Sequence, residues 1–415
     1  MTGGLGRTLI VLGGLLGGLA LGAGLAGSGA GAQLEAVAAP VGGIWLDALK
    51  MTVVPLVFAM LFTGVTEAAE TAAGGGMAAR ALGWFFALLL AAALFSVTVS
   101  PLLLRAWPVS GTEALAMVAN GAGAAAIPPA PPFGEWLRGF VPTNPVGAAA
   151  TGAMVPLVVF ALIFGLAATR LPPTPKAALT GLFDAIVQVM LVIIGWVLWA
   201  APLGIFGLAV GVGAALGGGA FALLGHYIAL VAGVQILLIL LIYPFAVLVG
   251  RVPLGDFVRA MLPVQVVAIG TQSSIACLPA MVEAAERLDL PEAPRRLVLP
   301  LAVSLFKITS PCANLAVITY LAAVHGVHPG LAQIAAGVAV SLAVAVASAG
   351  LPGGTSFFLA CVPIAAAMGV PTTLLPLLLA VEVIPDIFRT VGNVTGDVAV
   401  TAAVARGVGV PQQVD

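Results

Sequence analysis

The chain is poor in charged residues. Only 7% of its 415 residues are Asp, Glu, Lys or Arg, whereas about 25% is usual in a soluble globular protein. Hydrophobic residues make up 61% of the sequence, and the mean hydropathy is +1.18. The net charge of -1 and the lack of a long basic run argue against nucleic-acid binding. These values predict a protein that crosses a lipid bilayer many times.

Cysteine and histidine are also scarce. The three Cys residues show no CxxC or Cys/His metal spacing, so we expect no metal site and no cofactor. A hydrolase in the membrane would pair Ser273 or Ser274 with a base, but no His is in plausible reach at that depth. An ion channel would need a continuous polar path, and the sequence shows only one polar cluster. We therefore expect neither an enzyme nor a channel.

Long apolar runs fill most of the chain. A membrane-spanning helix needs about 20 apolar residues. The first run lacks a convincing cleavage site, so we interpret it as a span rather than a signal peptide. The proline-rich segment 106–144 is expected outside the membrane. The sequence predicts eight spans, at residues 6–27, 43–65, 79–105, 145–170, 180–212, 216–249, 293–325 and 370–405.

Two further apolar intervals, 255–288 and 330–366, are interrupted near the middle. The interruptions are TQSSIACLPA (271–280) and ASAGLPGGTS (347–356). Each half is too short to cross, so we expect two re-entrant hairpins, whose exposed backbone must be covered by protein or water. A pair of inverted hairpins is typical of secondary transporters that bind their substrate near the midplane.

Lys and Arg placement predicts the orientation of the chain. With both termini in the cytoplasm, ten of these residues lie inside and three outside, while Lys307 and Arg389 lie at membrane depth. We therefore expect a multi-pass protein of the inner (plasma) membrane with cytoplasmic termini.

The segment VEVIPDIFRTVGNVTGDVAV (381–400) carries ionisable residues inside an apolar span. On a helix that advances about 100° per residue, its polar residues share an arc of about 100°. Ionisable side chains at the centre of a span cost about 2.5–3.5 kcal/mol each, which favours a polar cavity over lipid. The alternative is an ion-pair network that only holds helices together. The stripe consists of Glu382, Asp386, Arg389, Thr390, Asn393 and Asp397.

The hairpin tips offer groups that bind carboxylates. Ser273 and Ser274 supply hydroxyls in the first tip, and Gly350 and Gly353 supply exposed backbone in the second. Free amides and the macrodipole attract carboxylates to helix N-termini. Arg389 can hold a second carboxylate in a bidentate pair. Asp386 could also accept a substrate ammonium. Together, these groups favour an acidic amino acid as the substrate.

Span 293–325 contains SLFKITSPCAN (304–314), whose proline and polar residues predict a break at mid-membrane. Lys307 adds a second buried cation there. A lysine at this depth is either paired or deprotonated, unless its side chain extends to the membrane surface.

Several stretches together resemble the glutamate/aspartate transporters, the dicarboxylate/amino acid:cation symporter family. They are LKMTVVPLVF (49–58), VPTNPVGAAATGAMVPLVVFALIFGLA (141–167), the serine tip ending in LP, the tip GLPGG, and DIFRTVGNVTGD (386–397). The resemblance covers almost the full length. It implies an all-α membrane protein with eight transmembrane helices, two re-entrant hairpins and inverted repeats, which assembles as a homotrimer and works as an elevator.

The resemblance also implies two domains. Residues 1–78 (spans 1–2) and 106–215 (spans 4–5) would form a scaffold. Residues 79–105 (span 3) and 216–415 (spans 6–8 and both hairpins) would form a transport domain that slides across the membrane.

Roles for individual residues follow from the same resemblance. Asp386 and Thr390 would bind the substrate ammonium, and Arg389 its side-chain carboxylate. Asn393 and Ser274 would bind the α-carboxylate. The expected substrate-binding set is Ser273, Ser274, Ser310, Gly350, Gly353, Asp386, Arg389, Thr390 and Asn393.

The chain departs from these relatives at the sodium positions. Leu89, Ala92 and Ala93 replace the Tyr, Thr and Ser of span three. Sodium needs several oxygen donors, as any hard cation does, and hydrocarbon cannot supply them. We expect no sodium at most family sites, although cation sites built from backbone remain open. In span seven, Asn-Met-Asp-Gly-Thr is replaced by Phe306, Lys307, Ile308, Thr309 and Ser310.

We hypothesise that Lys307 stands in for a sodium ion by neutralising Asp397 or Glu382. Relatives also carry a second arginine where this chain has Gln272 or Ile387, so Lys307 could fill that role instead. The expected function is transport of aspartate or glutamate, either independent of sodium or coupled to protons. The alternative is a carrier for C4 dicarboxylates. Such a substrate has no ammonium for Asp386 to bind.

Overall fold

The computed structural model is helical throughout the residues that it describes, 3–73, 75–109, 138–217, 219–347 and 353–406, and these residues contain no strand. The all-α prediction is therefore confirmed. The helices are α1 (Gly3–Gly24), α2 (Gly29–Ala73), α3 (Gly76–Ala106), α6 (Pro145–Ala150), α7 (Met154–Ala168), α8 (Pro173–Trp199), α9 (Ala201–Leu216), α10 (Gly219–Leu248), α11 (Leu254–Thr271), α12 (Leu278–Arg287), α13 (Glu292–Leu305), α14 (Thr309–Val324), α15 (Leu331–Ala347), α16 (Gly353–Met368), α17 (Leu375–Val381) and α18 (Val383–Arg406).

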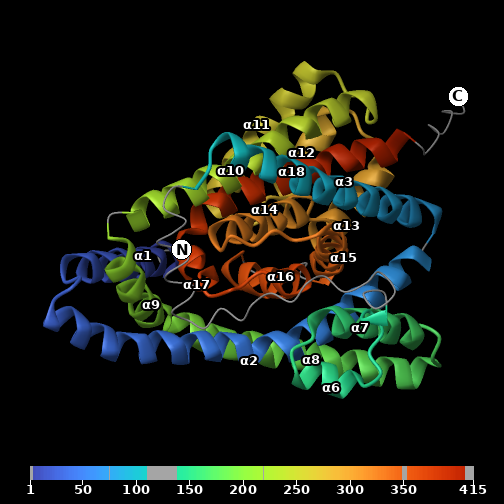
Figure 1. Ribbon diagram of the computed structural model, residues 1–415. Coiled ribbons are helices and arrows are strands. Elements are labelled where there is room, and N and C mark those ends of the chain that lie inside the picture. Colours follow the sequence, from blue (N-terminus) through green and yellow to red (C-terminus); the bar gives the residue numbers. More distant parts are fainter. Residues whose placement is uncertain (1–2, 74, 110–137, 218, 348–352, 407–415) are drawn as a thin grey trace, which may run out of the picture.

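One group of helices packs around α2. In Figure 1, α2 runs along the lower edge of the molecule, where it contacts α7, α8 and α9. Aromatic side chains link three of these helices, with ring centroids 4.3 to 6.1 Å apart. Such pairs add to the stabilisation that comes from burial of the rings. The aromatic side chains that link these helices are Phe58 and Phe62 of α2, Phe160 and Phe164 of α7, and Phe183 of α8.

Glycine lets α1 lie directly against α9. A Cβ atom at Gly14 would come within 2.6 Å of the Pro202 carbonyl oxygen, and one at Gly18 within 2.6 Å of the Phe206 carbonyl oxygen. Membrane helices associate closely through such small residues. Part of the high glycine content therefore serves helix packing.

A second group of helices surrounds α18, which contacts α3, α10, α11, α13 and α14. Phe85 of α3 stacks on Phe306, with ring centroids 4.8 Å apart and an interplanar angle of 15°. In Figure 1, α10, α11, α12 and α18 lie on the side of the molecule opposite α2. The polar stripe of the sequence is therefore carried by the second group.

Both predicted hairpins are helical pairs. In the first, α11 packs against α12 and the turn spans residues 272–277. In the second, α15 packs against α16, and residues 348–352 of its tip, which include Gly350, lie outside the described residues. The expectation that every hairpin half is too short to cross was wrong for α11. Its apolar run begins directly after Pro253 and gives 18 residues, enough to span by length and composition.

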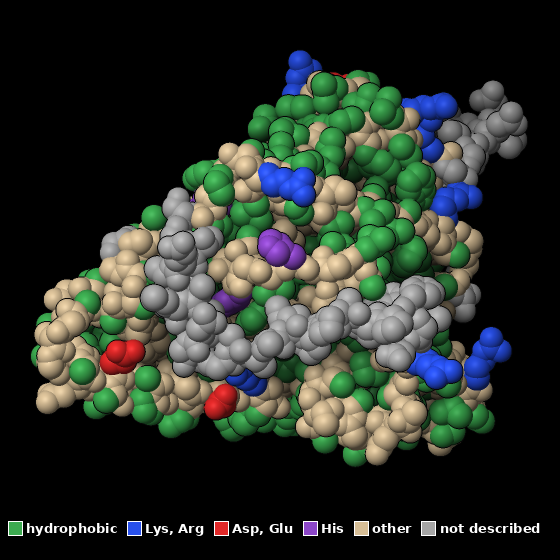
Figure 2. All heavy atoms as spheres, viewed as in Figure 1, with side chains coloured by type: hydrophobic (Ala, Val, Ile, Leu, Met, Phe, Trp, Pro, Cys, Tyr) green, Lys and Arg blue, Asp and Glu red, His purple; other side chains and the backbone are tan. Residues whose placement is uncertain are grey.

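Several predicted spans are divided. The span at 293–325 breaks at residues 306–308, and that at 370–405 breaks at Glu382. By length and composition, six helical stretches of the described residues are able to cross a membrane, one of them the broken stretch Glu292–Val324, so the predicted count of eight is not reproduced by this criterion. Figure 2 shows that hydrophobic side chains cover much of the visible surface and that Lys and Arg are few on it.

Candidate substrate site on helix α18

Most of the polar stripe lies on the part of α18 that faces the protein interior, and Glu382 directly precedes this helix. Arg389 and Asn393 are 7% and 4% exposed, and Asp397 is fully buried. Helix α18 is enclosed by α3, α10, α11, α13 and α14, which keeps these groups away from lipid, where each would be costly.

Arg389 is held by acceptors from two helices and one connection. Its Nη2 donates to Glu382 Oε1 at 2.5 Å, and its Nη1 donates to Asn314 Oδ1 of α14 at 3.0 Å. Asp386, the neighbour expected from helix spacing, is further away, with its Oδ1 3.5 Å from Nε. Glu382 rather than Asp386 is therefore the main acidic partner of this arginine.

Tyr227 of α10 completes this network. Its hydroxyl donates to Glu382 Oε2 at 2.6 Å, and its side chain is fully buried. Sequence reasoning missed both Tyr227 and Asn314. The only available signal was a polar group inside an apolar helix, because partners so far apart in the chain cannot be paired from spacing alone.

Two residues expected to bind substrate are engaged inside the protein. The Thr390 hydroxyl donates to the Asp386 carbonyl at 3.0 Å. Asn393 Oδ1 accepts from the Thr309 backbone N–H at 3.1 Å, and the Thr309 hydroxyl lies 2.8 Å from the same oxygen. Most of the apparent surplus of polar groups on the stripe is therefore satisfied by neighbours.

Asp397 is the exception. Neither carboxylate oxygen has a hydrogen-bond partner among the described residues. Lys307 lies in the break between α13 and α14 and makes no ion pair within 4.0 Å in the described part of the chain, but its charge acts on both Asp386 and Asp397. The lysine and the orphaned acid thus share one region without direct contact.

The serine residues divide between the hairpin and α14. Ser273 and Ser274 are partly exposed in the turn of the first hairpin, where the Ser273 hydroxyl accepts from the Ala276 N–H at 3.4 Å. Ser310 Oγ accepts from the Asn314 side-chain amide at 3.3 Å. Ser310 is therefore linked to Arg389 through the side chain of Asn314. Gly353 is the first residue of α16.

Residues 8–407 match the model of the sodium:dicarboxylate symporter family. The chain belongs to the sodium:dicarboxylate symporter family. This identifies a multi-pass membrane transporter rather than an enzyme.

Proteins similar to this chain differ in the substrates that their names give. A proton/glutamate-aspartate symporter of Escherichia coli (strain K12) is 24% identical over 381 residues, which cover 88% of this chain and 84% of that protein. A C4-dicarboxylate transport protein of Anaeromyxobacter sp. (strain K) is 27% identical over 377 residues, 88% and 83% of the two chains. Neutral amino acid transporter A of Homo sapiens is 27% identical over 442 residues, 94% and 79% of the two chains.

Ala92 and Ile308, two positions at which the resemblance predicts the loss of oxygen donors to sodium, border the same apolar cavity. Ala92 of α3 and Ile308 of the α13–α14 break both line this cavity of about 160 Å³, together with Leu238 and Gly396. Both residues stand where the resemblance places oxygen donors. The surroundings of these two positions are hydrocarbon, which is a poor environment for sodium.

Proposed function

We propose that this chain is a secondary active transporter of acidic amino acids, aspartate or glutamate, in the inner (plasma) membrane. The observation that carries the proposal is the buried Arg389 guanidinium with Asp386 beside it, 3.5 Å away. The cation suits a substrate carboxylate, and the acid suits an ammonium. The relative named as a glutamate-aspartate symporter supports the same substrate class.

In this proposal, a different set of residues binds each of the three charged groups of the substrate. Arg389 receives the side-chain carboxylate, while Asp386 and Thr390 receive the ammonium. Asn393 and Ser274 receive the α-carboxylate, with Ser273, Ser310, Gly350 and Gly353 as further contacts. Because Thr390 and Asn393 have internal partners in this structure, substrate binding in this scheme exchanges internal hydrogen bonds for substrate contacts.

Transport of a plain C4 dicarboxylate is the second candidate. The relative named as a C4-dicarboxylate transport protein favours it. Such a substrate would offer Asp386 no ammonium, and two carboxylates near an acid would repel it. Asp386 therefore supports the amino acid over the dicarboxylate.

We propose an elevator movement between the two helix groups. The helices around α2, from residues 1–78 and 106–215, would be the scaffold, and those around α18, from 79–105 and 216–415, the transport domain. Eight spans, two re-entrant hairpins and a homotrimer complete this proposal.

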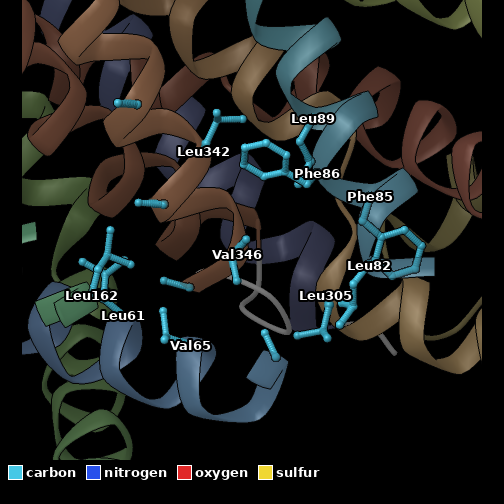
Figure 3. A pocket seen from close by; sticks show the side chains of 14 residues that line it. Leu61, Val65, Leu82, Phe85, Phe86, Leu89, Leu162, Leu305, Leu342 and Val346 are labelled. Carbon is cyan, nitrogen blue, oxygen red and sulfur yellow. The ribbon is translucent and has the colours of Figure 1, made fainter. Parts of the chain in front are cut away.

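An apolar cavity supports a sliding boundary between the groups. The cavity, of about 460 Å³, is walled by α2 and α7 on one side and by α3, α13 and α15 on the other. Figure 3 shows Leu61 and Val65 of α2 opposite Leu342 of α15 and Phe86 of α3. All residues that line it are apolar. Since no directional bond has to break across such a lining, it would oppose movement weakly.

For coupling, we propose that transport is independent of sodium or driven by protons, with the Lys307 ammonium in place of one sodium charge near Asp397. The apolar surroundings of Ala92 and Ile308 support this assignment. Coupling to sodium through sites built from backbone is the alternative.

Uptake by the purified protein in liposomes tests the proposal. We expect saturable uptake of labelled aspartate that continues when choline replaces sodium, and weaker competition from succinate than from glutamate. Preference for succinate would contradict the amino acid substrate. A steep dependence on sodium that choline cannot replace would contradict the role of Lys307.

A further inference from the structure

Glu382 is hydrogen-bonded to the Arg389 guanidinium, which is the group that would bind the carboxylate of the proposed substrate. Its Oε1 accepts from Arg389 Nη2 at 2.5 Å, while Nη1 of the same guanidinium donates to Asn314. A bidentate hold on a substrate carboxylate would use two N–H groups of this guanidinium. The Glu382 carboxylate and a substrate carboxylate therefore compete for one cation.

Glu382 is held from a second side as well. Its Oε2 accepts the Tyr227 hydroxyl at 2.6 Å, and its side chain is 3% exposed. Glu382 is the single residue between α17 and α18, and its N–H bonds to the Leu379 carbonyl three residues back, so the helical bond pattern tightens at this residue. The titratable and charged groups that face it are Tyr227 from α10, Cys361 from α16, and Asp386 and Arg389 from α18.

The charges of the site show why displacement of Glu382 is costly. The charged groups of the site are two cations, Lys307 and Arg389, and three carboxylates, Glu382, Asp386 and Asp397; of these, Arg389, Glu382 and Asp397 are buried. An acidic amino acid adds one further net negative charge. A carboxylate that leaves its arginine within the interior is an uncompensated buried charge, which costs several kcal/mol. Protonation removes that cost and keeps the total charge of the site constant.

We propose, building on the acidic-substrate function above, that Glu382 is the proton-coupling residue of this transporter. When the substrate carboxylate replaces it on Arg389, Glu382 takes up one proton from water on the side where substrate enters. When the substrate leaves, the Glu382–Arg389 pair re-forms and the proton is released. Tyr227 is a positioning residue, since its hydroxyl can donate to the ionised carboxylate and accept from the neutral acid.

Calorimetric titration of the purified full-length protein with aspartate, in buffers of different ionisation enthalpy, counts the protons taken up. In the wild type we expect uptake to approach one proton per aspartate as the pH rises, with the affinity falling about tenfold per pH unit in that range. Glu382→Gln should bind aspartate with no proton uptake and a flat pH profile. Glu292→Gln, which alters an exposed acid on α13, is the matched control and should retain the proton.

Tyr227→Phe gives an independent readout if Glu382→Gln does not fold. Loss of the hydroxyl removes a hydrogen bond to ionised Glu382, which makes protonation easier, so binding should persist to higher pH than in the wild type. Wild-type binding without proton uptake at any pH, or an unchanged proton count in Glu382→Gln, overturns the inference. Binding of succinate but not aspartate would instead overturn the proposed substrate, and the proton count would then be measured with succinate.

Discussion

Asp397 poses the main electrostatic problem at the residue scale. It is fully buried, and its carboxylate oxygens lack hydrogen-bond partners among the described residues. Lys307 is the cation whose charge acts on it. Removal of one partner of a buried charge pair is strongly destabilising because the other charge remains. The site should therefore depend on Lys307 even without direct contact.

Lys307→Met tests this dependence. We expect the affinity for aspartate to fall more than about tenfold at neutral pH, because Asp397 loses its compensating charge. Addition of Asp397→Asn should restore part of the affinity. Lys176→Met, which removes a partly buried cation of α8 paired with Glu70, is the control for loss of a lysine. Equal aspartate affinity in Lys307→Met and the wild type, measured by calorimetry, would contradict the role of Lys307.

Single-residue chemistry was only partly predictable. Insertion cost and helical periodicity identified the stripe on α18, because both depend on residue type and spacing alone. The partners of Arg389 depend on tertiary packing. Tyr227 and Glu382 are 155 positions apart, and Asn314 and Arg389 are 75 apart. No local pattern connects such residues.

At the scale of elements, the α13–α14 break is tied to α18 by Thr309. Its hydroxyl lies 2.9 Å from the Arg389 carbonyl and 2.8 Å from Asn393 Oδ1, and its backbone N–H also donates to that oxygen. Hydrogen bonds of Thr309 therefore hold the break at residues 306–308 against the middle of the polar stripe.

Thr309→Val should lower the free energy of unfolding by about 1 kcal/mol, because the hydroxyl bond is lost while shape and the N–H bond are kept. Thermal unfolding in detergent provides the measurement. Thr98→Val, whose hydroxyl donates to the Leu94 and Phe95 carbonyls of its own helix at an exposed position, should unfold close to the wild-type temperature. A Thr309 variant as stable as that control would contradict the fastening role.

Helix existence was easier to predict than helix limits. Apolar runs identified most elements, and SLFKITSPCAN correctly indicated a break. The runs did not reveal that α2 continues for 45 residues through Pro40 and Pro55, or that one hairpin arm reaches spanning length. Helix α2 extends past its apolar segment because packing against neighbours stabilises the added turns, whereas α11 is long because its apolar run starts directly after Pro253.

At the scale of the whole molecule, the two helix groups meet closely at Gly64 of α2 and Ala347 of α15. A Cβ atom on Gly64 would lie 3.3 Å from the Ala347 Cα, so a shift of a few tenths of an ångström is needed to accommodate a cysteine here, and the two positions are close enough for a cross-link. Since the proposal assigns α2 to the scaffold and α15 to the transport domain, a bond here would join the two.

Gly64→Cys combined with Ala347→Cys should form a disulfide that lowers aspartate uptake by about tenfold or more, since carrier turnover is limited by conformational steps. Binding of aspartate should persist, and a reductant should restore uptake. Each single cysteine variant serves as a control. Uptake at the wild-type rate by fully cross-linked protein would contradict movement of α15 relative to α2.

The central claim is that Arg389 binds a carboxylate of an acidic amino acid without help from sodium. Its most direct test is a calorimetric titration of aspartate into wild-type protein and Arg389→Lys in a choline buffer. Lysine keeps the positive charge, so Glu382 is not left unpaired. It lacks the planar guanidinium that holds a carboxylate with two parallel hydrogen bonds. We predict saturable binding to the wild type and at least about a tenfold loss of affinity in a variant that unfolds at a similar temperature. Equal aspartate affinity in both proteins, or no binding to the wild type until sodium is added, would contradict the claim.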